Sequence, residues 1–125
     1  MKFPNIYITS TEAEPTLQPR KCKIIKPIWS NERKTYFYLV RMDRPIRLDF
    51  SEEKYEIVIA PRHLGVKIIE EIKTHPLVFI CFIKNYENIH RGIVEAADLK
   101  LFIIGEIYES EVEAEKAIKG EKNTI

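Results

Sequence analysis

The chain has 125 residues, of which 45% are hydrophobic and 31% are charged, and its formal net charge is +1. These proportions are ordinary for a globular domain, and they exclude a disordered or low-complexity chain. The length predicts a single domain over 1–125, with an N-terminal strand, arm and loop over 1–20, a core over 21–119 and a frayed tail over 120–125.

The apolar segments and the cysteines predict a cytoplasmic protein with no membrane-spanning segment. Residues 1–15 lack the apolar core of a secretory signal. The longest apolar run, 77–83, has seven residues, whereas a membrane-spanning helix needs about 20. Cys22 and Cys81 each lie in an apolar segment, which favours buried, reduced thiols over a disulfide. A catalytic or metal-binding role for either thiol is the alternative.

The first part of the chain is predicted to form strands. A short strand over 6–8 precedes a polar loop over 9–20 that contains two prolines. Within 21–28, apolar residues alternate with lysines, which is the pattern of a half-buried strand, and Pro27 is expected to interrupt that strand. Segment 35–42 is rich in the aromatic and branched side chains that suit a pleated surface.

Residues 45–60 are predicted to form a β-hairpin. Apolar and charged residues alternate over 45–50, the polar sequence SEEK, 51–54, forms the loop, and 55–60 returns as the second strand. The apolar side chains that share a face within each segment are those of Ile46, Leu48 and Phe50, and of Tyr55, Ile57 and Ile59.

The hydrophobic period changes near Gly65, and we expect an amphipathic helix over about 65–74. Four apolar side chains fall on one side of the helical wheel, opposite the charged ones: Leu64, Ile68, Ile69 and Ile72. Pro76 disfavours the α conformation of the residue before it, so the helix should end there. The alternative is that 66–69 continues a strand.

Two further strands are predicted in the second half of the chain. Segment 77–84 shows no alternation, which indicates a strand covered on both faces. Residues 85–92 are interpreted as a loop because they contain two asparagines and a glycine. Segment 98–108 predicts another strand, in which Gly105 marks a bulge or a close approach of backbone.

A second helix is predicted over 110–119. Ser110 is followed three residues later by Glu113, which is the spacing of a capping box at a helix N-terminus. Together the elements predict an α+β fold: a mostly antiparallel curved sheet or small barrel of five to six strands with two short helices, over about 65–74 and 110–119.

The sequence contains no signature of catalysis or of cofactor binding that we recognise. His63, His75 and His90 are 12 and 15 residues apart, and no His or Cys pair has the spacing of metal ligands, so no metal site is predicted. There is no dinucleotide-binding or Walker-type glycine motif and no nucleophile elbow. We therefore expect no cofactor and favour a protein that is not an enzyme, with carboxylates converging in the fold as the alternative.

Basic residues are concentrated in 20–47, which carries nine Lys and Arg against two acids. Cationic side chains interleaved with aromatic ones are typical of surfaces that hold single-stranded nucleic acid. Five residues are the candidate nucleic-acid contacts: Lys21, Lys23, Trp29, Arg41 and Arg47. The alternative is a solvated basic face that is neutralised by acids from 98–125, a segment that contains seven acids and four lysines.

The sequence PRHLG, 61–65, is the candidate anion-binding or partner-binding site. The helix expected after it has no capping side chain, so its first amides would lack an acceptor. Such amides beside Arg62 and His63, with Gly65 in the turn, would suit a carboxylate, a phosphate or a partner's acidic side chain. The alternative is an ordinary turn in which Arg62 pairs with a nearby acid.

Three hypotheses about function follow. The first is a non-enzymatic cytoplasmic binding or interaction module that meets an unknown protein partner or associates with itself as a homodimer. The second is a nucleic-acid-binding protein that uses the basic segment 20–47. The third is a site for a small anionic ligand, or an enzyme site, at Arg62 and His63.

Overall fold

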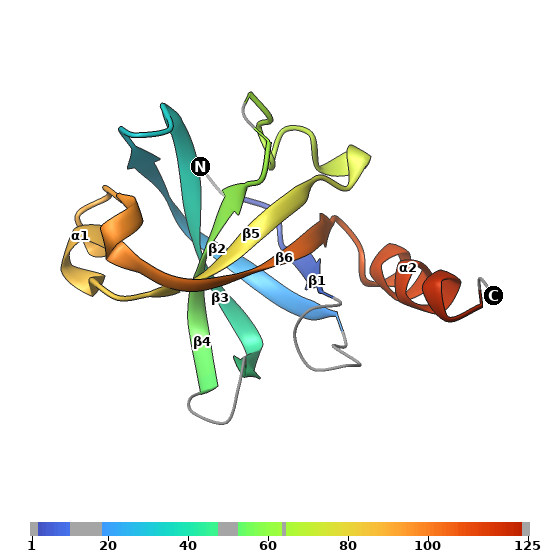
Figure 1. Ribbon diagram of the computed structural model, residues 1–125. Coiled ribbons are helices and arrows are strands. Elements are labelled where there is room, and N and C mark those ends of the chain that lie inside the picture. Colours follow the sequence, from blue (N-terminus) through green and yellow to red (C-terminus); the bar gives the residue numbers. More distant parts are fainter. Residues whose placement is uncertain (1–2, 11–18, 48–52, 64, 124–125) are drawn as a thin grey trace.

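The structure is a computed structural model that describes residues 3–10, 19–47, 53–63 and 65–123. Within these residues, six antiparallel strands form a closed barrel in which each strand pairs with the next along the chain and β6 returns to β1 (Figure 1). The strands are β1 (Ile6–Thr9), β2 (Arg20–Ser30), β3 (Thr35–Arg47), β4 (Glu53–Pro61), β5 (Leu77–Ile83) and β6 (Leu99–Tyr108).

Helical segments lie outside the barrel wall. Two α-helices, α1 (Tyr86–His90) and α2 (Glu111–Asn123), lie at opposite sides of the barrel in Figure 1. Two short 3-10 helices, η1 (Ile72–Thr74) and η2 (Ala96–Asp98), belong to the connections before β5 and before β6. The predicted α+β fold, a small antiparallel barrel with two short helices, is confirmed. No helix of the described residues is both long enough and apolar enough to cross a membrane.

Apolar side chains cover both faces of the barrel wall. The inner cluster fills the barrel, and it takes side chains from all six strands and from the segment before β5. The outer cluster lies on the opposite face, against α1 and the segment that follows it. Its buried members are Ile28, Phe37, Leu39, Val58, Ala60, Cys81, Ile83, Ile89 and Val94. The lack of alternation in β5 follows from this arrangement, because its side chains enter the two clusters in turn, as the sequence predicted.

Strand β2 continues through Pro27, so the predicted interruption is wrong. A β-bulge between Ile24 and Lys26 shifts the register just before the proline, and Pro27 then lies opposite Tyr38 of β3. Strand β1 pairs only with the Arg20–Cys22 end of β2. The edge of β2 beside Pro27 is therefore not paired with β1. A strand tolerates proline at such an edge, because no N–H is needed there for a hydrogen bond to a neighbouring strand.

The predicted hairpin over 45–60 is confirmed where the structure describes it. Strands β3 and β4 pair antiparallel, and Ile46 is buried opposite Lys54. In β4, Ile57 and Ile59 are buried in the inner cluster, whereas Tyr55 is exposed. Leu48 and Phe50 lie outside the described residues.

The helix predicted over 65–74 is wrong. The described part of the segment forms turns, with one isolated α-type hydrogen bond from the Glu71 amide to the Lys67 carbonyl, and η1 is its one 3-10 helix. Ile68 and Ile72 are buried in the inner cluster, so the apolar spacing correctly indicated burial. An isolated helix of about ten residues rich in branched side chains is marginal, and turns that bring the same isoleucines to the barrel interior replace it.

The loop predicted over 85–92 contains α1, so that interpretation is also wrong. The Asn85 side chain caps the helix by accepting a hydrogen bond from the Asn88 amide, and Ile89 packs into the outer cluster. Gly92 ends the turn with φ at +89°. A helix of five residues is too short for a hydrophobic period to be detected in the sequence.

The predictions for β6 and for the last helix are confirmed, apart from where the helix ends. Gly105 has its Cα so close to β1 that an added Cβ would lie 2.5 Å from the Thr9 carbonyl oxygen. The Ser110 hydroxyl accepts a hydrogen bond from the Glu113 amide at 3.2 Å, and α2 begins there. Helix α2 runs to Asn123 instead of 119, so the tail predicted to fray from 120 is helical over 120–123.

Candidate functional site

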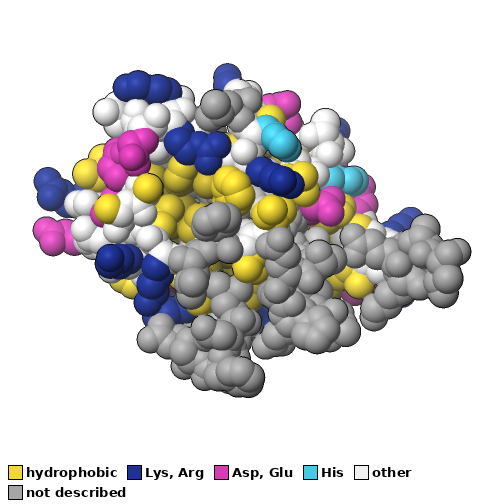
Figure 2. Space-filling view, viewed as in Figure 1, with side chains coloured by type: hydrophobic (Ala, Val, Ile, Leu, Met, Phe, Trp, Pro, Cys, Tyr) yellow, Lys and Arg dark blue, Asp and Glu magenta, His cyan; other side chains and the backbone are white. Residues whose placement is uncertain are grey.

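A groove on the outer face of the barrel is the main candidate site. It has a volume of about 500 Å³ and lies over β3, β4, β5 and the start of β6, between the β2–β3 turn and η2. We call it the outer groove. Its lining residues are Ser30, Glu32, Arg33, Phe37, Ala60, Phe79, Cys81, Ala96, Leu99 and Lys100. Figure 2 shows hydrophobic side chains gathered over the strands in the middle of the molecule's face, with Lys and Arg side chains beside them.

The floor of the outer groove is apolar because it is an uncovered end of the outer cluster. Strand β4 lies between β3 and β5, and Ala60 of β4 pairs with Phe79 of β5. Ala60 and Phe37 are 2% and 5% exposed, so the half-buried Phe79 and Leu99 are the more accessible apolar side chains of the floor. Helix α1 and the segment after it cover the rest of the outer cluster and leave this end open.

Arg33 places a positive charge at the groove. Its guanidinium carbon lies 5.9 Å from the centre of the Phe37 ring and 6.0 Å from that of Phe79, within the range of cation–π attraction. The Ser30 hydroxyl accepts a hydrogen bond from the Arg33 amide at 3.2 Å, which fixes the turn that carries the side chain. Among the described residues, no carboxylate forms an ion pair with the Arg33 guanidinium.

The β2–β3 turn is fastened to the segment that carries η2. The Glu32 carboxylate accepts a hydrogen bond from the Ala96 amide at 2.7 Å. In the opposite direction, the Glu95 carboxylate accepts one from the Asn31 amide at 3.3 Å. Hydrogen bonding to Glu32 raises the pKa of Glu95 above its usual value. The two glutamates therefore clamp one rim of the outer groove, and the carboxylate of Glu32 is occupied by backbone.

Cys81 is the thiol of the groove floor, and it is poorly suited to be a nucleophile. Its side chain is 6% exposed. Burial raises the pKa of Cys81 to about 12, and the nearby positive charge of Arg33 offsets only part of that effect. Because the thiolate is the reactive form, Cys81 acts at neutral pH as a small apolar side chain.

Sequence reasoning missed the outer groove. Arg33 was noted only as one of nine basic residues, and Phe37, Ala60 and Phe79 appeared as ordinary strand residues. The one usable signal was the lack of alternation over 77–84, which indicated that the outer face of that strand has a cover. The extent of that cover depends on the contacts between the β2–β3 turn and the segment that carries η2. No local pattern in the sequence predicts those contacts.

The five candidate nucleic-acid contacts do not form one surface. Lys23 and Arg41 lie directly opposite each other on β2 and β3 and point outward, and Lys21 is exposed on the same strand. Arg41 forms an ion pair with Glu56 at 3.7 Å and lies over the Tyr55 ring.

Trp29 lies beyond the β-bulge of β2, on the opposite face from its neighbour Ile28, which is in the outer cluster. Its ring packs edge-on against Tyr36. Trp29 is therefore not the aromatic neighbour of Lys21 and Lys23. The side chain of Arg47 lies outside the described ones, and nucleic-acid binding by segment 20–47 stays a prediction.

Within the PRHLG segment, Pro61 is the buried last residue of β4, and Arg62 and His63 follow it at the surface. Arg62 and His63 are exposed, Gly65 has φ at +84°, and the Arg62 amide donates to the Leu77 carbonyl. No α-helix begins at Gly65, so Arg62 and His63 do not lie beside the uncapped N-terminus of a helix, as was expected. Leu64 lies outside the described residues. The reason for expecting an anion there, a helix N-terminus with free amides, is therefore gone. Binding of an anion or a partner at Arg62 and His63 stays a prediction.

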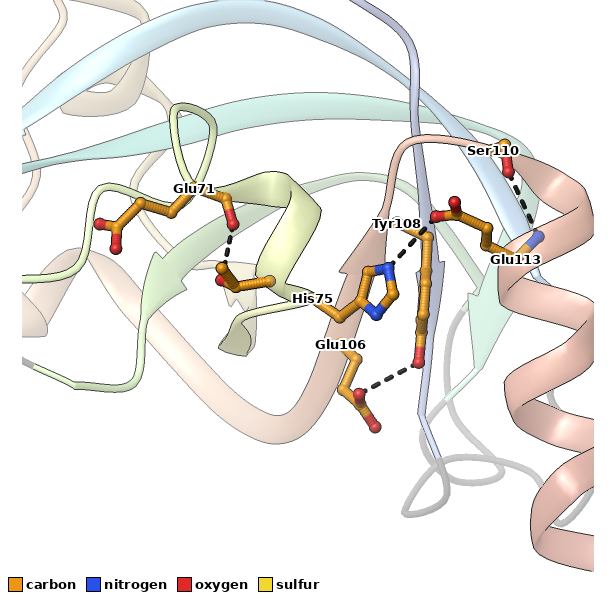
Figure 3. A network of polar contacts seen from close by, with 7 residues as sticks. Glu71, His75, Glu106, Tyr108, Ser110 and Glu113 are labelled. Carbon is orange, nitrogen blue, oxygen red and sulfur yellow. Dashed lines mark hydrogen bonds and ion pairs between the residues drawn. The ribbon is translucent and has the colours of Figure 1, made fainter.

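A polar network joins the β4–β5 connection to α2 (Figure 3). The His75 ring lies 4.4 Å from that of Tyr108, and its Nε2 is 3.2 Å from the Glu113 carboxylate. The Tyr108 hydroxyl donates to Glu106 at 3.0 Å. These contacts connect α2 to β6 and to the residue after η1, so the network has an evident structural role.

Comparisons of the chain with protein-family models, curated proteins and solved structures found no match. Among the described residues, no group of three or more His, Cys, Asp or Glu side chains is placed to hold a metal ion. Among the described residues, the outer groove combines a hollow, an apolar surface and an arginine without an ion-pair partner.

Proposed function

We propose that the protein is a non-enzymatic binding module and that the outer groove holds its ligand. One observation carries the proposal: an open hollow of about 500 Å³ whose apolar floor is overlaid by the Arg33 side chain. Small-molecule sites are typically hollows of this size, lined by apolar and aromatic side chains with a few polar groups that orient the ligand. Cys81 supplies apolar contact instead of reactivity.

The expected affinity is modest because the groove is open on one side. Burying roughly 150 Å² of apolar ligand surface contributes about 4 kcal/mol to binding. The cost of immobilising the ligand reduces this gain. A charge-assisted hydrogen bond adds about 1.5–3 kcal/mol. These gains sum to about 5.5–7 kcal/mol before the cost of immobilising the ligand is subtracted, so dissociation constants no tighter than about 0.01 mM follow.

A cytoplasmic location is part of the proposal. Cys22 and Cys81 are free and buried, which supports a compartment that keeps thiols reduced. Self-association and a protein partner stay predictions.

A titration with the neutral apolar dye N-phenyl-1-naphthylamine tests the proposed binding surface. Ala96 lines the groove and is exposed on η2, so Ala96→Phe places a ring in the hollow without replacing a buried side chain. Ala97→Phe is the matched control because Ala97 is the next residue of η2, is also exposed and does not line the groove.

We expect dye fluorescence to rise on binding to the wild type and to Ala97→Phe, and the affinity of Ala96→Phe to fall about tenfold or more. Thermal unfolding of all three proteins, followed by circular dichroism, should confirm that they fold equally well. Equal dye affinity for Ala96→Phe and Ala97→Phe would overturn the outer groove as the binding surface, as would no binding to the wild type.

A further inference from the structure

The groove's charges point to the chemistry of its ligand. We propose that the outer groove selects an organic anion with a flat apolar body and a single carboxylate, and that Arg33 receives the carboxylate. This inference rests on the proposed function, because it names the ligand of the same groove. It goes beyond that function in assigning a charge preference and a residue that determines it.

The shape of the floor favours a flat body. Phe37 and Phe79 line the groove on two strands with Ala60 between them, and the half-buried Phe79 is the more accessible of the two rings, because Phe37 is 5% exposed. Aromatic groups pack on one another by offset or edge contacts, which adds to the gain from area burial alone. A flat ring system uses the groove better than a branched aliphatic body of the same volume.

Arg33 favours the carboxylate. Its guanidinium carbon lies 5.9 Å and 6.0 Å from the centres of the Phe37 and Phe79 rings, which places the positive charge at the apolar floor. A guanidinium has five N–H donors in a planar fork that matches the two oxygens of a carboxylate. Because no carboxylate among the described residues is in ion-pair contact with it, these donors are available to a ligand.

The other charged residues of the groove agree with an anionic ligand. Lys100 lines the groove and adds a second positive charge. The acid in the lining, Glu32, directs its carboxylate to the Ala96 amide. Burial raises the pKa of the Cys81 thiol, and the positive charge of Arg33 lowers it. The charge of Arg33 therefore acts on the groove floor.

Three ligands with one body and different charges test the inference: 2-naphthoate, 2-naphthylmethanol and 2-naphthylmethylamine. Each is titrated into the full chain at pH 7.5 and low salt by displacement of N-phenyl-1-naphthylamine. We expect 2-naphthoate to bind about tenfold more tightly than the alcohol, and the cationic amine to bind most weakly. Added salt should reduce the advantage of the acid over the alcohol.

Replacement of Arg33 identifies the determinant. Arg33→Gln should lower the affinity for 2-naphthoate to that for the alcohol, with the affinity for the alcohol changed less than threefold. Arg33→Lys keeps the charge without the planar fork and should retain part of the preference. Arg91→Gln is the matched control, because Arg91 is an exposed arginine that does not line the groove, and it should leave all three affinities unchanged.

The outcomes separate this inference from the proposed function. If the acid, alcohol and amine bind equally well and Ala96→Phe weakens all three, the anion preference is overturned and the proposed function stands. If 2-naphthoate is preferred equally by Arg33→Gln and the wild type, the assignment to Arg33 is overturned. If none of the naphthyl ligands or the dye binds to the wild type, both proposals are overturned.

Discussion

Glu32 and Glu95 each hold the backbone of the other's segment. Glu32 accepts from the Ala96 amide and Glu95 from the Asn31 amide, so the two side chains cross between the β2–β3 turn and η2. A hydrogen bond with Glu32 raises the pKa of Glu95 above its usual value, so the folded protein favours the protonated form of Glu95. Because Glu32 and Ala96 line the outer groove, the clamp also determines the position of its rim.

The Glu32–Glu95 clamp should make stability depend on pH. The folded-state pKa of Glu95 is raised, so the folded protein binds this proton more tightly than the unfolded chain does. The stabilisation is complete below the ordinary glutamate pKa and is lost as the pH rises through the raised value. Glu95→Gln keeps the acceptor for Asn31 and cannot ionise, so its stability should fall less over this range.

Urea midpoints measured from pH 4 to 7 for the wild type, Glu95→Gln and Glu109→Gln check this expectation. Glu109 is an exposed acid outside the clamp and serves as the control. The difference between wild type and Glu95→Gln should grow with pH, whereas that between wild type and Glu109→Gln should stay constant. Parallel curves for all three proteins would show that the clamp does not bind a proton preferentially on folding.

Gly105→Ala should destabilise the barrel by about 3 kcal/mol, at the upper end of what overpacking usually costs. An added Cβ would lie 2.5 Å from the Thr9 carbonyl oxygen and 2.7 Å from the Ile80 side chain, and the first of these is backbone of the paired strand. The closure between β1 and β6 would have to open. Urea unfolding at neutral pH measures the loss.

Gly92 provides a contrast, because its substitution cost arises from φ at +89° and an added Cβ has nothing within 4 Å. Gly92→Ala should cost about 1–2 kcal/mol, and Gly92→Asn less, since asparagine adopts this conformation more readily. Gly105→Asn should be at least as harmful as Gly105→Ala. Recovery by asparagine at Gly105 would contradict the steric explanation.

His75→Asn should loosen α2 without unfolding the barrel. Asparagine suits the left-handed backbone of His75, whose φ is 52°, but it removes the ring that lies on Tyr108 and contacts Glu113. We expect faster hydrogen exchange in α2 and a loss of at most about 1 kcal/mol in global stability, because an exposed ion pair contributes little.

Exchange followed by mass spectrometry locates the effect of His75→Asn, and His63→Asn is the control because His63 is an exposed histidine that does not take part in the contacts with Tyr108 and Glu113. Exchange rates in α2 that match those of the wild type would contradict a role of the His75 contacts in holding the helix, and would leave that role to other packing such as that of the buried Ala114.

Cys81 should resist thiol reagents in the native protein. Raising its pKa from 9.0 to about 12 reduces the thiolate fraction at pH 8 by about a thousandfold. Burial also raises the pKa of Cys22. Alkylation by iodoacetamide, mapped by mass spectrometry, should be slow at both positions in the native state and fast in urea. Rapid native labelling of Cys81 would contradict its assignment as an inert part of the groove floor.

Local patterns in the sequence were enough to predict most of the strands. Alternation around Cys22 and Ile24 and the lack of alternation over 77–84 reflect whether one or both faces of a strand are covered, and the structure confirms both interpretations. The Ser110–Glu113 spacing located the start of α2 because capping acts between residues close in the chain. Glycine in a strand indicates a bulge or a close approach of backbone, and the structure shows the close approach at Gly105.

The errors occurred where distant parts of the chain decide the local conformation. The isoleucines of 65–74 have the spacing of a helix face, yet the open end of the barrel accepts Ile68 and Ile72 from turns. Helix α1 forms over five residues because the outer cluster buries Ile89. Neither outcome could be predicted from periodicity, since burial by the rest of the fold outweighs helix propensity.

The sequence by itself determined the strands, the capped last helix and the excess of positive charge in 20–47, because these depend on residues close together in the chain. Only the tertiary structure decided that β2 passes through Pro27, that Trp29 is separated from Lys23, and that Arg33 lies over Phe37 and Phe79. The physical reason is closure: the register of six strands and the Glu32–Glu95 clamp bring residues from β2 to β6 to one outer surface. A hollow between them exists only once those contacts have formed.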